Sequence, residues 1–219
     1  MKKYIIFIGM LILIITFSLS LFYTESKQYQ DVSQTSSEVP IGELVKSDII
    51  RQSFIVQHNN FNEVQIYFGT YQRLNNSTLK LELFDEEKNV IYEELFNSIE
   101  LEDNKFRDFV FDPVKNSAGK KFIVSITVEG GEIGNYITLW KSSSDLYKDG
   151  ELYLNGNQLD GDMVFKTFYT SSMLDKLNDL LRQLPVSIVI SYIVLVGGIL
   201  SCIFYFIVVI YEVYKYRKN

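Results

Sequence analysis

Two long stretches without a charged residue, near opposite ends of the chain, constrain the fold more than any other feature. The first covers residues 4–22 and the second covers residues 186–211. A transmembrane helix needs about 20 consecutive apolar residues, and both stretches are apolar on every side of a helix instead of on one face. The sequence therefore predicts transmembrane helices at residues 1–23 and 186–211, with the rest of the chain between them.

The first stretch has one alternative, a cleaved secretory signal, because Lys2 and Lys3 precede it. Its apolar run is longer than that of a typical signal peptide, and no A-x-A cleavage motif follows it. We therefore favour a retained anchor. Basic residues accumulate on the cytoplasmic side of membrane proteins, and they also occur in the tail of residues 212–219. We expect a two-pass protein of the bacterial plasma membrane, with both termini in the cytoplasm and residues 24–185 outside.

The region between the two stretches is acidic. Residues 24–172 contain 14 Lys and Arg side chains against 24 Asp and Glu, a net charge of −10, which disfavours binding to nucleic acid. The one cysteine, Cys202, lies in the second uncharged stretch, so the outer region has no disulfide. With His58 as the only histidine, a zinc site built from paired histidines is excluded.

Residues 41–172 show the pattern of an antiparallel β-protein. Apolar residues alternate with polar ones, as in Leu79, Leu81 and Leu83, and Gly, Asn and Asp separate the runs. A period of two with one polar face is typical of a sheet with one side in water. The expected strands are residues 49–57, 63–71, 78–84, 89–95, 107–111, 121–128, 136–141, 151–154 and 163–169. We therefore predict a mainly β fold, an antiparallel, jelly-roll-like β-sandwich flanked by the two transmembrane α-helices.

Two segments flank the predicted sandwich. Residues 24–40 are polar, rich in Ser, Thr and Gln, and lack apolar periodicity, which predicts a flexible stalk. Residues 173–185 carry leucines on one helical stripe and charges opposite, which predicts an amphipathic helix capped by Ser171 or Ser172. Three roles are open to this helix: packing under its own domain, lying on the membrane surface, or pairing with a second copy.

Short turn motifs follow one another in a recognisable order along the middle of the chain. They are Gln52-Ser53-Phe54, Thr70-Tyr71-Gln72-Arg73-Leu74-Asn75, Asp103-Asn104, Phe111-Asp112-Pro113, Ser117-Ala118-Gly119-Lys120, Tyr147-x-x-Gly150-x-Leu152, Asn155-Gly156 and Gly161-Asp162. This region, residues 41–170, resembles the extracytoplasmic β-sandwich domains of bacterial membrane proteins associated with cell-surface polysaccharide and glycosyl transfer. Those domains are similar in shape to carbohydrate-binding modules. The resemblance implies a sandwich fold and contact with polysaccharide, whereas the multi-spanning transferase part of such proteins has no counterpart in this sequence.

Tyr71 and Arg73 are the first candidates for a ligand site, because an aromatic ring beside a guanidinium can stack on a sugar and hydrogen-bond to it. The alternative is that this stretch only forms turns, in which its Asn and Asp residues are favoured. Sugar binding on a sandwich uses exposed aromatic rings, which adds Tyr67, Tyr136 and Trp140 as candidates. Each ring has the alternative role of filling the core or covering a sheet edge.

Acidic residues lead to two further hypotheses. Asp160 and Asp162 carry carboxylates of the kind that bind calcium, although a solvated turn is the simpler explanation. No other cofactor is expected. A pair of carboxylates across a cleft can hydrolyse a glycoside, but no pair stands out among the 24 acidic residues, so we expect no enzyme activity.

These observations predict a membrane-anchored, non-catalytic accessory protein of the bacterial cell envelope. Its outer sandwich would bind surface polysaccharide or a membrane partner that synthesises it. One alternative is a structural or assembly subunit that binds only proteins, and a less favoured one is a glycosidase or transferase with an unrecognised site. Small residues in the second stretch, Ser187-x-x-x-Ser191 and Gly197-x-x-x-Ser201, permit close contact with another helix, from a membrane glycosyltransferase or from a second copy of this chain.

Overall fold

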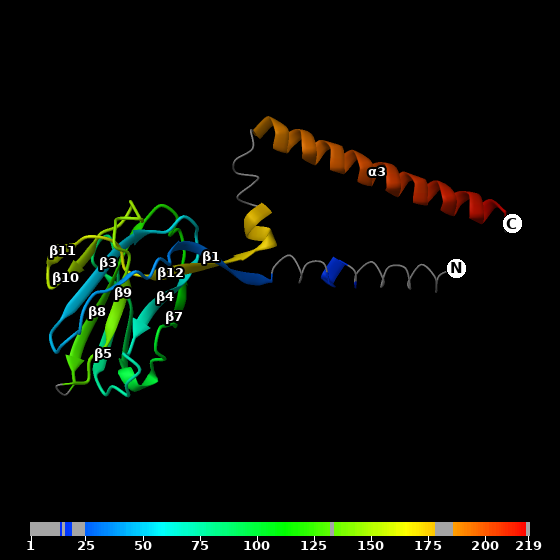
Figure 1. Cartoon of the computed structure of the whole chain (residues 1–219). Helices are drawn as coiled ribbons and strands as arrows, with labels where there is room; N and C mark the ends of the chain where they lie inside the picture. The colour runs from blue at the N-terminus through cyan, green and yellow to red at the C-terminus, as the bar shows by residue number, and fades with distance from the viewer. Residues whose placement is uncertain (1–13, 15, 19–24, 132–133, 178–185, 218–219) are drawn as a thin grey trace. The chain divides into compact units, whose positions relative to one another are not determined.

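The computed structural model describes residues 14, 16–18, 25–131, 134–177 and 186–217. The chain forms two compact units, one of residues 26–171 and one of residues 1–25 together with residues 172–219. The first unit contains the strands and is called the β-domain below (Figure 1).

The β-domain contains two six-stranded sheets with antiparallel pairing. One sheet has the order β1 (Ser26–Gln34), β12 (Phe165–Ser172), β4 (Phe61–Gly69), β9 (Thr138–Lys141) and β2 (Val39–Pro40), and β7 (Lys105–Val114) also pairs with β4. The other has the order β11 (Asn157–Leu159), β10 (Leu152–Leu154), β3 (Ile49–Ile55), β8 (Lys121–Gly130), β5 (Thr78–Asp85) and β6 (Val90–Asn97). The predicted mainly β, antiparallel architecture is confirmed.

Phenylalanine rings from both sheets meet in one core. Phe54 of β3 packs against Phe61 of β4 and Phe165 of β12, with ring centres 5.8 and 5.4 Å apart. Phe96 of β6 and Phe109 of β7 lie 5.4 Å apart in the same way. Each of these pairs joins one sheet to the other, so the two sheets face each other across a shared apolar core.

The period-two pattern of the sequence produces the two faces of β5. Leu79, Leu81 and Leu83 are fully buried, whereas Lys80 and Glu82 between them form an ion pair of 2.8 Å. All nine predicted strands are present, with ends that differ from the prediction by a few residues. Strand β11, which pairs with β10, is an additional strand that the sequence pattern did not indicate.

The predicted flexible stalk at residues 24–40 is wrong, because most of this segment forms strands β1 and β2. In β1, Val32 and Gln34 are only 9% and 4% exposed. The hydroxyl of Thr167 accepts the N–H of Val32 at 2.9 Å and donates to its carbonyl at 3.2 Å, and Gln34 Nε2 donates to the carbonyl of Asp162 at 2.9 Å. A strand that points glutamine inward shows no apolar alternation, so its sequence resembles a linker.

The segment predicted to form an amphipathic helix is helical at its start. Residues 173–177 are helical, and Ser172 caps them. The backbone N–H and the hydroxyl of Ser172 donate to Asp175 Oδ2 at 2.9 and 2.8 Å, while the N–H of Asp175 donates to Ser172 Oγ at 3.0 Å. This reciprocal pairing satisfies donors that a helix start leaves open. Residues 178–185 lie outside the described residues.

The second uncharged stretch lies within one helix, α3 (Val186–Tyr216). Within it, the Ser201 hydroxyl donates to the carbonyl of Gly197 at 2.9 Å. The first stretch lies outside the described residues, apart from residues 14 and 16–18, which are helical. Among the helices that the structure describes, none combines the length and the apolar content needed to cross a membrane.

Candidate functional site

Three of the five candidate aromatic and basic residues line one hollow of about 380 Å³ in the β-domain, called the Trp140 hollow below. Its walls come from β2, the end of β4, the β4–β5 turn, the segment before β7, and β9. The lining residues are Pro40, Gly69, Tyr71, Gln72, Arg73, Asp103, Asn104, Thr138 and Trp140. Tyr71, Arg73 and Trp140 are thus brought together from distant parts of the sequence.

Trp140 is held in place by its neighbours. Its indole Nε1–H donates to Asn104 Oδ1 at 2.8 Å. An ideal Cβ on Gly69 would lie 2.9 Å from that same Nε1 and 2.9 Å from Thr138 Cγ2. The indole therefore lies directly against the backbone of β4, at a position where only glycine leaves room for it. The ring is oriented before any ligand arrives.

The β4–β5 turn that carries Tyr71 is strained. The N–H of Arg73 donates to the carbonyl of Thr70 at 3.1 Å, and both central residues of this turn, Tyr71 and Gln72, have φ of 56°. Two positive φ angles are the pattern of a type I′ turn, which normally carries Asn and Gly. A left-handed backbone costs other residues roughly 1–2 kcal/mol each. Such strain accumulates at functional sites, where it fixes a side chain in a required position.

Asp103 ties this turn to the neighbouring wall of the hollow. Its Oδ1 accepts the backbone N–H of Thr70 at 2.6 Å and the Thr70 hydroxyl at 3.1 Å, and its Oδ2 accepts Asn104 Nδ2 at 3.1 Å. Both carboxylate oxygens are therefore bonded to donors of the protein itself. Asp103 and Asn104 together fix the spacing between the turn and Trp140.

Arg73 and Gln72 supply the polar groups that remain available to a ligand. The guanidinium carbon of Arg73 lies 5.6 Å from the centre of the Tyr71 ring. Its Nη1 lies 4.0 Å from Glu43 Oε1, and the two side chains are 53% and 51% exposed. An exposed ion pair at this distance contributes little, so a ligand can replace Glu43. The exposed Gln72 side chain forms no hydrogen bond within the described part of the chain.

The chemistry of the hollow suits a polar ligand with one apolar face. The C–H face of a sugar ring stacks on an aromatic side chain, and its hydroxyls pair with amide and guanidinium groups at the rim. An aromatic wall with a few convergent polar groups is the usual form of a small-ligand site.

The other two aromatic candidates lie elsewhere. The ring of Tyr67 packs against Phe106 with 4.9 Å between ring centres. Tyr136 lines a separate hollow of about 170 Å³, together with Leu44 and Val128. Neither residue belongs to the Trp140 hollow.

The two aspartates proposed for calcium have different surroundings. Asp162 is 1% exposed, and its Oδ2 accepts the backbone N–H groups of Leu146 at 3.0 Å and Tyr147 at 2.9 Å. Asp160 is exposed, and its backbone carbonyl accepts Lys141 Nζ at 2.7 Å. In the part of the chain that the structure describes, no group of three or more His, Cys, Asp or Glu side chains is arranged to hold a metal ion. Calcium binding stays a prediction.

Six members of the hollow were not singled out as site residues by the sequence: Pro40, Gly69, Gln72, Asp103, Asn104 and Thr138. Gly69 carried a usable signal, because a glycine inside an apolar strand often marks the close approach of another group. The roles of Asp103 and Asn104 depend on partners far away in the sequence, Thr70 and Trp140, so no local pattern indicates them.

No model of a known protein family matches the chain, and no curated protein matches it. The chain is similar to the solved structure of a GH26-CBM35 β-(1,4)-mannanase from Podospora anserina, at 12% identity over 67% of this chain and 28% of that one, with a TM-score of 0.29. It is similar to the enzymatically active domain of tailspike protein 4 from bacteriophage CBA120, at 13% identity over 60% of this chain and 20% of that one, with a TM-score of 0.28. The chain spans less than a third of either protein, and likeness at this level carries no argument about function.

Proposed function

We propose that the β-domain is a saccharide-binding module and that the Trp140 hollow is its binding site. The main support for this proposal is the position of the Trp140 indole at one wall of the hollow. The indole is held there by its hydrogen bond to Asn104 and by the absence of a side chain at Gly69. Tyr71 stands at the rim on a turn of positive φ. An indole that is fixed in advance loses little conformational entropy on binding, which favours affinity for a weakly held ligand such as a sugar.

We further propose that this module acts by binding alone. A glycosidase needs one carboxyl group that exchanges a proton and a second one across the cleft. Asp103 is the one carboxylate among the residues that line the hollow, and its oxygens accept hydrogen bonds from Thr70 and Asn104. This arrangement supports a positioning role for Asp103.

The proposal places the β-domain on the outer side of a bacterial plasma membrane, anchored by the two uncharged stretches, where it contacts surface polysaccharide or the enzyme that makes it. The support comes from the length of both stretches and from the basic residues that flank them. Alkaline carbonate extraction of membranes, followed by protease treatment of intact spheroplasts, tests this placement. Loss of the protein into the carbonate supernatant, or protection of the β-domain from the protease, would refute it.

Binding is tested by titrating the full chain in detergent solution with oligosaccharides of hexoses, N-acetylhexosamines and uronic acids. Trp140 is the only tryptophan, so its fluorescence reports on the hollow directly. We expect saturable quenching or a spectral shift with at least one class. Tyr71→Ala should weaken binding by about tenfold, the low end of the roughly 1–3 kcal/mol that a nucleic-acid base gains by stacking on one aromatic ring. Tyr67→Ala, which removes a ring outside the hollow, should leave binding unchanged.

A protein-binding subunit is the second candidate. Leu74 follows Arg73 at the rim of the hollow and is 86% exposed, and Ile99 is 62% exposed. A contiguous patch of exposed apolar side chains often marks a protein-binding surface, and Leu74 and Ile99 are the residues from which such a patch would be built. Absence of sugar binding by a folded chain would favour this candidate over the saccharide module. Equal loss of sugar binding in the Tyr67 and Tyr71 variants would instead show that the Trp140 hollow is not the binding site.

A further inference from the structure

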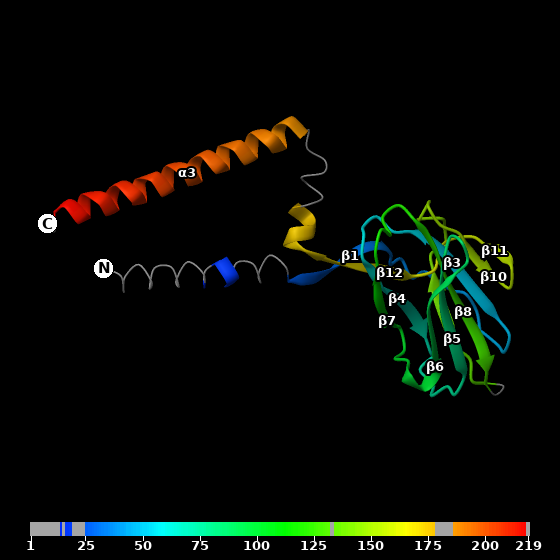
Figure 2. The ribbon, with the colours of Figure 1, turned by 180° about the vertical axis from the view of Figure 1, so that it is seen from behind.

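Another hollow of the β-domain lies on the sheet that does not carry Trp140, and it shares no residue with the Trp140 hollow. It has a volume of about 460 Å³ and is called the Arg51 hollow below. Its walls come from β3, from the turn before β3, and from β10 with the turn toward β11, three strands that lie side by side in Figures 1 and 2. The lining residues are Ser47, Ile49, Arg51, Tyr153, Asn155 and Gly156.

Arg51 and Trp140 face outward from opposite sheets. Ile50 and Gln52, on either side of Arg51 in β3, are 1% and 0% exposed. Leu139, directly before Trp140 in β9, is 0% exposed. Successive side chains of a strand point to opposite sides of its sheet, so Arg51 and Trp140 both point away from the shared core. The two hollows are therefore separate places on the β-domain, and one sugar residue cannot fill both.

Arg51 carries a positive charge without a carboxylate partner. The β-domain has two other arginines, and each lies within 4.0 Å of a glutamate: Arg73 beside Glu43, and Arg107 beside Glu94. Within the described part of the chain, the side chain of Arg51 forms no ion pair and no hydrogen bond, and it is exposed. In so acidic a region, a guanidinium that faces no carboxylate is available to an anion from outside the chain.

Tyr153 and Asn155 form walls of the Arg51 hollow whose positions are fixed. Tyr153 lies directly opposite Arg51 in the pairing of β10 with β3, and residues paired in this way point to the same side of the sheet. The Tyr153 hydroxyl donates to Glu151 Oε2 at 2.8 Å. Asn155 Oδ1 accepts the backbone N–H of Ile49 at 2.8 Å. The aromatic ring therefore stands beside the guanidinium, and the turn after β10 is tied to the start of β3.

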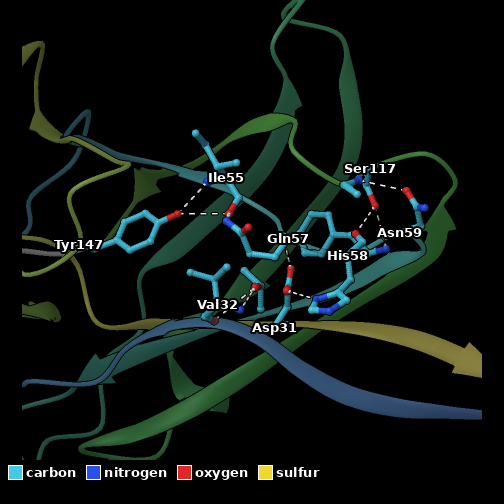
Figure 3. Close-up of polar contacts among 11 residues, drawn as sticks. Asp31, Val32, Ile55, Gln57, His58, Asn59, Ser117 and Tyr147 are labelled. Atoms are coloured by element: carbon cyan, nitrogen blue, oxygen red, sulfur yellow. Dashed lines mark hydrogen bonds and ion pairs between the residues drawn. The ribbon is translucent and has the colours of Figure 1, made fainter. Parts of the chain in front are cut away.

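Strand β3, which carries Arg51, is also held at its other end. The hydroxyl of Tyr147 accepts the N–H of Ile55 at 2.9 Å and donates to the carbonyl of Ile55 at 3.2 Å (Figure 3). Two residues later, Asp31 Oδ2 accepts the N–H of Gln57 at 2.9 Å. Side chains thus hold the backbone at both ends of β3, so Arg51 projects from a fixed base. Fixing a binding group in advance reduces the entropy that is lost on binding.

We propose that the Arg51 hollow binds a sugar that carries a carboxylate, such as a hexuronic acid residue of a polysaccharide. The guanidinium pairs with the carboxylate through two parallel hydrogen bonds, and the face of the sugar ring rests on Tyr153. The Ser47 hydroxyl, which forms no hydrogen bond within the described residues, is free for a sugar hydroxyl. This site does not depend on the Trp140 hollow. A β-domain with both sites binds two stretches of polymer at once, one on each sheet.

Calorimetry of the full chain in detergent tests this site with two probes, a trimer of galacturonic acid and the matching neutral trimer of galactose. The titrations use the Tyr71→Ala chain, in which the Trp140 hollow is impaired. We expect the neutral trimer to bind at least tenfold more weakly than the acidic one, because hydrogen bonds to a charged group are the stronger ones. Adding Arg51→Gln should weaken binding of the acidic trimer by the same factor. Lys121→Gln, which removes an exposed positive charge from the neighbouring strand β8, should leave it unchanged.

Trp140 fluorescence keeps this result apart from sugar binding in the Trp140 hollow. In Arg51→Gln, the response of that fluorescence to sugars should equal that of the parent chain. No binding of the acidic trimer, equal binding of both trimers, binding that survives Arg51→Gln, or an equal loss in Lys121→Gln would each overturn the Arg51 hollow as a site. A parent chain that binds the acidic trimer through Arg51 without any fluorescence response to sugars would support this site and refute the Trp140 hollow.

Discussion

Asn104 accepts the indole N–H of Trp140 at 2.8 Å and donates its own amide hydrogen to Asp103 at 3.1 Å. Two consecutive residues thus fix two walls of the Trp140 hollow, since Asp103 also binds the start of the β4–β5 turn through Thr70. The shape of the hollow depends on this short segment, and it is set before a ligand enters.

Gly69→Ala should displace the indole and impair the hollow. The new Cβ would lie 2.9 Å from both Trp140 Nε1 and Thr138 Cγ2, and overpacking of this kind costs about 1–3 kcal/mol. We expect a changed Trp140 emission spectrum and weaker sugar binding. Gly130→Ala is the matched control, because its Cβ would meet no atom closer than 3.8 Å. An unchanged spectrum in Gly69→Ala would show that the indole does not lie against β4.

Gln72→Gly should stabilise the chain. Gln72 has φ of 56° in the β4–β5 turn, and glycine adopts this conformation without a steric penalty. Relief of roughly 1–2 kcal/mol of backbone strain is partly offset by about 0.4–1 kcal/mol, because glycine makes the unfolded chain more flexible. We expect a net gain of about 0.5–1 kcal/mol in the free energy of unfolding, measured by denaturant titration. Asn116→Gly, with φ of 55°, is the control and should gain less, since asparagine tolerates the left-handed region. Equal gains at both positions would argue against strain specific to the turn.

Asp162→Asn should destabilise the β-domain. The carboxylate accepts two backbone N–H groups through Oδ2, and Oδ1 lies 3.5 Å from the donor Gln52 Nε2. The asparagine side chain would have one oxygen acceptor in place of two, so its NH₂ group would face a hydrogen-bond donor on one side. A buried donor left without an acceptor costs about 1–3 kcal/mol. Thermal unfolding should show this loss, whereas Asp160→Asn, at an exposed position, should change stability by less than about 0.5 kcal/mol.

The alternative role of these two aspartates is to bind calcium together, and adding the ion distinguishes the two roles. If they bind the ion together, added calcium raises the melting temperature of the parent chain, and both substitutions abolish that rise. If Asp162 only anchors the loop, calcium has no effect and the two variants differ in stability as stated. Melting curves with calcium and with a chelator distinguish the two results.

The cap of the short helix η1 (Ser98–Glu100) should open in acid. The backbone N–H of Asn97 donates to Glu100 and, with the nearby Arg107 guanidinium, holds the pKa of the Glu100 carboxyl below its usual value of 4.5. A lowered pKa means that the ionised form is favoured in the folded state, so this stabilisation is present near neutral pH and is lost as the pH falls through the lowered value. The Asn97 amide resonance should titrate with a midpoint below 4.5.

Glu100→Gln separates the cap from the charge, because glutamine can occupy the same position of a capping box. In this variant the Asn97 resonance should stay constant over the same range of pH. A titration that survives the substitution would assign the effect to another carboxylate, such as Glu94, which lies 2.9 Å from Arg107.

Sequence periodicity predicted the parts of the fold that apolar burial determines. Leu79, Leu81 and Leu83 are buried because they alternate along β5, and the turn after them follows from Asp85, whose Oδ1 accepts the N–H groups of Glu87 and Asn89. Strand β1 was missed because a buried polar residue, Gln34, replaces an apolar one.

The candidate site was predicted in part. Residue type alone indicated Tyr71, Arg73 and Trp140, which do share a hollow. It also indicated Tyr67, and it could not show that this ring is covered by Phe106. Alternation along a strand gives the face on which a ring lies, but the partner of that ring comes from another strand, and only the three-dimensional register determines it.

The neighbouring positions of β1 and β12 have a consequence for how this domain can be moved between proteins. Tyr29 contacts Tyr169 and Val32 contacts Thr167, so the two strands run in opposite directions. The chain therefore enters and leaves the β-domain at the same end, as Figures 1 and 2 show. A folding unit with adjoining ends can be inserted into a surface loop without spreading the residues on either side. The β-domain, residues 26–171, therefore has the end-to-end geometry that insertion into a surface loop of a host protein requires.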